Sequence, residues 1–109
     1  MTRDKTSLDT DDVLRLLAAR RRRVALRVLL DRPDRTADTS TLAAGVRRRC
    51  EPDRVPGTAD DIELQLHHAD IPKLTTASVT TYDRTTRRVS YEGHDEVDAL
   101  LELLGARFE

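Results

Sequence analysis

The chain has 109 residues, 36% of them charged, and a formal net charge of −1, which fits one soluble domain with a modest core. Its single cysteine, Cys50, excludes an internal disulfide and a zinc site of paired cysteines. No apolar run approaches the roughly 18 residues that cross a bilayer. We therefore expect a cytoplasmic protein. The charge is uneven, because residues 1–58 hold fourteen Lys and Arg against nine Asp and Glu, whereas residues 59–109 hold five against eleven.

The first element expected after a flexible polar tail over residues 1–8 is a helix. Asp9 or Thr10 can cap it, because short polar side chains accept hydrogen bonds from the free N–H groups of a first turn. Apolar residues then follow at helical spacing. We expect this helix to run to about Ala19.

Residues 20–30 predict a second helix, which is apolar on most sides and therefore belongs in the core; Pro33 ends it. It opens with the arginine run 20–23. Four consecutive helical residues point through about 300°, so they cannot all face one surface, whereas Arg20, Arg23 and Arg27 are expected to align as one stripe. Two interpretations stay open, which are phosphate contact and a solvated or salt-bridged face with Asp11 and Asp12 as partners.

Thr39 or Ser40 is expected to cap a third helix that ends in an arginine run. Cations at this end complement the helix dipole. Arg47 and Arg48 are also candidate contacts to DNA phosphates. Residues 51–58, which contain two prolines, read as a loop.

Thr58 opens a further helix that is expected to reach Ile71, with apolar residues Ile62, Leu66 and Ala69 on one side, before Pro72 kinks or ends it. Its side chains that can bond base edges or phosphates are Gln65, His67, His68 and Lys73. We interpret it as a candidate recognition helix. Its acids, which would repel a DNA backbone that they faced, are Asp60, Asp61, Glu63 and Asp70.

From Val79 the pattern alternates, and residues 79–82 and 88–91 predict a β-hairpin. Its exposed turn is expected to contact phosphates or the minor groove through Arg84, Arg87 and Arg88. Three core helices followed by a hairpin, or wing, predict a mainly α winged helix-turn-helix domain over residues 9–92.

Residues 93–109 predict an additional C-terminal helix with a net charge of −4, which argues against contact with DNA. Its apolar seam consists of Val97, Leu101, Leu104 and Phe108. This seam either pairs two copies in a homodimer, which we favour, or closes onto its own domain.

Three segments resemble a haloarchaeal family of small winged-helix proteins: residues 16–23 (LLAARRRR), 66–74 (LHHADIPKL) and 79–84 (VTTYDR). The second half is also similar to ArsR-type repressors, although the metal-binding cysteines of those proteins have no counterpart here. Ser78 stands where ArsR-type repressors have a glycine, a position that favours a left-handed backbone, so the sequence leaves open a mildly strained serine or a different helix end. The resemblance implies transcription regulation through double-stranded DNA.

The sequence therefore predicts a DNA-binding transcriptional regulator rather than an enzyme. The alternative is a winged-helix protein-interaction module whose acidic helix binds a basic partner protein. We expect no cofactor or metal, because His67 and His68 diverge by about 100° on a helix and His94 is distant. Cys50 could sense oxidants, but a buried, inert thiol is the favoured interpretation.

Overall fold

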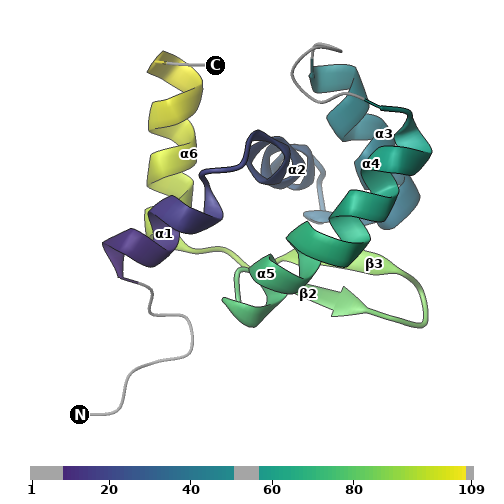
Figure 1. Cartoon of the computed structure of the whole chain (residues 1–109). Coiled ribbons are helices and arrows are strands. Elements are labelled where there is room, and N and C mark those ends of the chain that lie inside the picture. The colour runs from purple at the N-terminus through teal and green to yellow at the C-terminus, as the bar shows by residue number, and fades with distance from the viewer. Residues whose placement is uncertain (1–8, 51–56, 108–109) are drawn as a thin grey trace.

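The computed structural model of the protein describes residues 9–50 and 57–107 (Figure 1). Its elements in chain order are α1 (Thr10–Leu16), α2 (Arg20–Leu30), β1 (Thr36–Asp38), α3 (Thr39–Arg49), α4 (Ala59–Gln65), a π-helical turn η1 (Leu66–Asp70), α5 (Ile71–Thr76), β2 (Thr80–Asp83), β3 (Arg88–Tyr91) and α6 (Asp95–Arg107). The expected mainly helical fold with a small hairpin and a C-terminal helix is confirmed, and the hairpin belongs to a three-stranded sheet. The predicted tail over residues 1–8 and the side chain of Phe108 lie outside the described residues.

The helices surround α2, which occupies the centre of the molecule (Figure 1). α3 and α4 lie on one side of it, and α1 and α6 on the other. The buried side chains of Leu26 and Leu29 from α2 belong to one apolar cluster that includes residues from each of these four helices and from the sheet. One core therefore unites the described chain, α6 included.

The sheet has the strand order β1-β3-β2, with both pairings antiparallel. The predicted hairpin is confirmed, and Tyr82 pairs with Val89 across it. β1 was not predicted. It has three residues and becomes a strand through pairing with β3, where Ala37 lies opposite Val89. Such a short strand has no periodicity of its own, so the sequence carries no local signal for it.

Two helix termini, the end of α1 and the start of α3, differ from the prediction, and the start of α4 matches it. α1 ends at Leu16 rather than near Ala19, and a short bend separates it from α2. α3 is capped by Asp38, one residue before the expected Thr39, and its carboxylate accepts from the Thr41 N–H at 2.7 Å. Thr58 caps α4 as expected, in a reciprocal capping box with Asp61.

The Asp38 cap gives a stability prediction that depends on pH. Hydrogen bonds from Thr41 lower the pKa of Asp38 below the ordinary aspartate value. A lowered pKa stabilises the folded state at neutral pH, and this contribution disappears as the pH falls below about 4. Asp38→Ala is expected to cost about 1 kcal/mol at pH 7 and less at pH 3, as measured by urea unfolding at both values. An equal cost at both values would contradict the charged cap.

The helix from Thr58 is not a continuous α-helix, because η1 inserts a wider turn before Pro72. In an unbroken α-helix, Lys73 would fall within about 20° of the buried Ile62, and Ile71 would point to the opposite side. In the structure Ile71 is buried and Lys73 is exposed. The π turn therefore rotates the second half of the helix. Ala69, expected on the buried stripe, is only partly buried.

The end of α5 leads into the hairpin through a left-handed residue. Ser78 has a φ of 63°, so of the two alternatives the left-handed serine, rather than a different helix end, is the one observed. The Val79 N–H bonds the Leu74 carbonyl and the Ser78 N–H bonds the Thr75 carbonyl, both at 3.0 Å, which is the Schellman pattern. This turn fixes how the hairpin lies against α5.

Candidate nucleic-acid interface

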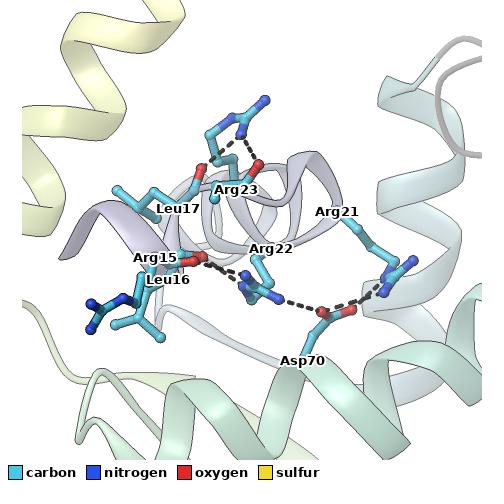
Figure 2. A network of polar contacts seen from close by, with 8 residues as sticks. Arg15, Leu16, Leu17, Arg21, Arg22, Arg23 and Asp70 are labelled. Carbon is cyan, nitrogen blue, oxygen red and sulfur yellow. Dashed lines mark hydrogen bonds and ion pairs between the residues drawn. The ribbon is translucent and has the colours of Figure 1, made fainter. Parts of the chain in front are cut away.

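The arginine run at the start of α2 serves the fold (Figure 2). The Arg22 side chain is 8% exposed. Its Nε donates to the Leu16 carbonyl at 2.6 Å, one terminal nitrogen to the Arg15 carbonyl at 2.9 Å, and the other to Asp70 at 3.3 Å. Arg22 thus satisfies the last carbonyls of α1 and ties α1 to the helix that carries Asp70.

Asp70 is fully buried, and it accepts from both Arg21 and Arg22 (Figure 2). Two expectations are corrected by this contact. Asp70 does not face outward to repel DNA, and the acidic partner of Arg21 and Arg22 is Asp70 rather than Asp11 or Asp12. A signal was present in the sequence, because Asp70 stands four residues after Leu66 and therefore near the buried side.

The expected stripe of Arg20, Arg23 and Arg27 is also largely used within the chain. Arg23 donates to the Leu17 carbonyl at 2.7 Å. Arg27 donates to the Leu101 carbonyl at 3.0 Å and so anchors α6 on α2. These contacts favour the salt-bridged and hydrogen-bonded interpretation of the run over phosphate binding.

A groove runs between the helix formed by η1 and α5 and the hairpin formed by β2 and β3. It is lined by His67 from η1 and by Arg84 and Arg87 from the turn, as well as by Thr75, Thr76 and Tyr82. The rings of His67 and Tyr82 meet edge to face with their centroids 6.2 Å apart. The structure therefore brings the predicted helix residue His67 together with two predicted wing residues.

The turn that carries these arginines is ordered by its own hydrogen bonds. The Asp83 carboxylate accepts from the Thr85 N–H at 2.9 Å and from the Thr86 N–H at 3.3 Å. Arg87 adopts a left-handed backbone with a φ of 57°. A short aspartate turn of this kind holds the arginine backbone at the mouth of the groove.

The other predicted contacts are exposed, but they are spread more widely. Gln65, His68 and Lys73 are exposed on the same helix as His67. Arg88 is exposed and lies 3.7 Å from the Asp34 carboxylate, so part of its charge is already paired. Lys73 does not line the groove, but it directly follows Pro72, which does.

Arg47 and Arg48 are exposed in the last turn of α3. That end of α3 lies at the top of Figure 1, whereas the hairpin lies at the bottom. The neighbouring Arg49 pairs with Asp31 at 2.6 Å. The structure therefore does not bring Arg47 and Arg48 to the groove.

The remaining acids of the candidate recognition helix gather at its start. Asp60 and Asp61 occupy the first turn of α4, where their negative charge interacts favourably with the helix dipole. The Asp61 carboxylate also accepts a hydrogen bond from the Thr58 N–H. Glu63 accepts from the Thr39 hydroxyl at 2.8 Å. α4 begins at the end opposite to α5 in Figure 1, so the acids lie away from the groove.

The seam predicted on the C-terminal helix needs correction. Val97 is 0% exposed and Leu101 is 3% exposed, because both pack in the core of their own domain. These two residues cannot carry a dimer interface while α6 keeps this position, and the alternative in which the seam closes onto its own domain fits them. Leu104 is partly buried, and the large apolar residue that α6 does expose is Leu103, at 54%. A homodimer stays a prediction.

The base of α6 is also held to the sheet. The Tyr91 hydroxyl donates to the Asp98 carboxylate, and Tyr91 is itself buried. Burial, followed by this hydrogen bond, raises the pKa of Tyr91 well above its ordinary value. The contact therefore joins β3 to α6 with a neutral phenol.

Within residues 9–50 and 57–107, no three His, Cys, Asp or Glu side chains gather as a metal site. Within the same ranges, no helix is long and apolar enough to span a bilayer. Cys50 is a buried thiol at the end of α3.

Fold and groove together define a small helical domain with a three-stranded sheet and a cationic groove beside its hairpin. A family model described as a domain of unknown function (DUF7344) matches residues 14–90, and the chain belongs to this family. The match extends from α1 into β3 and leaves α6 outside. No curated protein and no solved structure was found to match the chain.

Proposed function

We propose that the protein is a transcriptional regulator that binds double-stranded DNA in the cytoplasm through a winged helix-turn-helix. The order of elements supports this proposal. α2, α3 and the helix from α4 to α5 would be the three core helices, and β2 and β3 the wing. In this arrangement α4 to α5 would lie in the major groove, and the wing would lie along the phosphates.

The observation that carries the proposal is the groove shared by His67, Arg84 and Arg87. The two arginines of the turn meet the His67 ring from a separate element there, and exposed Lys73 follows on the helix. Guanidinium groups suit phosphate oxygens because their planar donors bond two oxygens at once. The acids of the helix gather at its far end, so DNA on this groove would avoid most of their repulsion.

The proposal is tested by fluorescence anisotropy with a random 20-base-pair duplex at several salt concentrations. With about three phosphate contacts from each chain, log K is expected to fall with log salt at a slope of about −2.7. The protein must stay folded throughout, which circular dichroism checks. Absence of binding at low salt by the folded protein would contradict the proposal and favour the protein-interaction module.

A further inference from the structure

A second cavity, which adjoins the groove beside the hairpin at Pro72 and Thr76, lies between the end of α1 and the start of α5. Its volume is about 590 Å³, and it includes residues from α1, α2 and α5. We propose that it binds a small organic anion with an apolar body, and that occupancy weakens DNA binding. The second half of this proposal rests on the proposed function.

The cavity has the size and the composition of a ligand site. Small-molecule pockets commonly have volumes of about 300–1,000 Å³ and apolar walls with a few polar groups. Here Leu16, Pro72 and Ala77 supply the apolar wall. The apolar part of a ligand with a few carbon atoms would therefore pack against this wall.

The charges around the cavity favour an anion. Among the described residues that line it, the cations are Arg15, Arg22 and Lys73, and the acid is Asp12. The Asp12 carboxylate already lies 3.5 Å from Arg15. Lys73 has no ion pair among the described residues. Arg22 is paired with the buried Asp70, so Lys73 supplies the positive charge that these ion pairs leave uncompensated, although the whole chain has a net charge of −1.

Arg22 distinguishes this cavity from a chance cluster of surface cations, because its position is fixed by burial and hydrogen bonds. It is buried, and three of its five N–H groups bond Leu16, Arg15 and Asp70 within the described chain. Two N–H groups remain for the oxygens of a ligand. A carboxylate bound there would compete with Asp70 for the same guanidinium.

The position of the cavity would couple it to DNA binding. Lys73 lines the cavity and also belongs to the proposed DNA contacts. Arg22 holds Asp70, the last residue of the π turn that directs Lys73 outward. An anion in the cavity would therefore draw Lys73 away from phosphate and loosen the turn. Both effects lower the affinity for DNA.

The ligand site is tested without DNA, by titrating the ¹⁵N-labelled protein with octanoate and following amide shifts. We expect saturable shifts confined to the end of α1, the start of α2 and α5. Octan-1-ol and octylamine are the matched probes without the negative charge. Equal binding of octan-1-ol, or shifts scattered over the surface, would overturn the proposal.

Two exposed residues give matched variants. Lys73→Gln is expected to weaken octanoate binding by about fivefold, because it removes a charge at the cavity. Arg84→Gln removes the same charge from the other groove and is expected to leave binding unchanged within about twofold. Equal weakening by both variants would show only general attraction of an anion and would overturn the site.

The coupling is tested by adding octanoate to the DNA titration, with chloride at the same ionic strength as the control. Octanoate is expected to lower DNA affinity more than chloride does. Equal effects would overturn the coupling. If the folded protein binds no DNA at all, the coupling fails with the proposed function, whereas the NMR titration still decides the ligand site.

Discussion

Replacing Asp70 by alanine is expected to lower the free energy of unfolding by about 3–5 kcal/mol, because it leaves the buried Arg22 without its carboxylate. Arg21 loses the same partner, but its side chain is 27% exposed and water can solvate it. A domain of this size has a total stability of about 5–15 kcal/mol. Urea unfolding measures the loss, and Tm should fall by more than about 10 °C.

Asp60→Ala is the matched control, since it removes an aspartate from the same helical segment at an exposed position. Its expected cost is below about 1 kcal/mol, from the lost interaction with the helix dipole. A second variant separates charge from packing. Asp70→Asn keeps the shape of the side chain but removes its charge. If this variant also loses much of the free energy of unfolding, the effect is due to charge. An Asp70→Ala cost no larger than that of Asp60→Ala would contradict the buried ion pair.

The parts of the fold that sequence predicted well are governed by local rules. Alternating β-branched and aromatic residues separated by a polar turn placed the hairpin, and Thr58 followed by Asp60 and Asp61 marked the start of α4. At Ser78 the sequence left open a strained left-handed serine or a different helix end, and the φ of 63° decides for the first. Each of these signals spans only a few residues.

The parts that sequence did not predict depend on distant partners. Arg22 and Asp70 are 48 residues apart, and their bond sets which arginine of the run turns inward. The π turn also depends on distant contacts. It places Asp70 and Ile71 in the core, whereas Ala69 is only partly buried. A period of 3.6 cannot show such a rotation, because an unbroken helix would place Lys73 near the buried Ile62; Lys73 was named as a candidate contact from its residue type, and it is exposed.

The candidate interface was predicted in part. His67, Arg84 and Arg87 were named from residue type and position, and the structure gathers them at one groove. Arg47 and Arg48 were named for the same chemistry, but α3 carries them to the far end of the molecule. Charge type is visible in a sequence, whereas the direction in which a helix runs through the fold is not.

The double variant Arg84→Glu with Arg87→Glu is expected to lower the affinity for random duplex DNA by about 100-fold at low salt. It removes two phosphate contacts and adds two repulsive charges at the same place. The salt slope should also become shallower by about 1.8, since each lost contact accounts for about 0.9. Both arginines are exposed, so the fold should be unaffected.

The most direct test of DNA binding through this groove is to titrate that double variant beside Arg47→Glu with Arg48→Glu. Both variants change the net charge by the same amount, but only the first alters the groove. The large loss of affinity is predicted for the groove variant alone, with a loss of less than about fivefold for the other. Equal losses in the two variants, or no binding by the folded wild-type protein, would contradict the account.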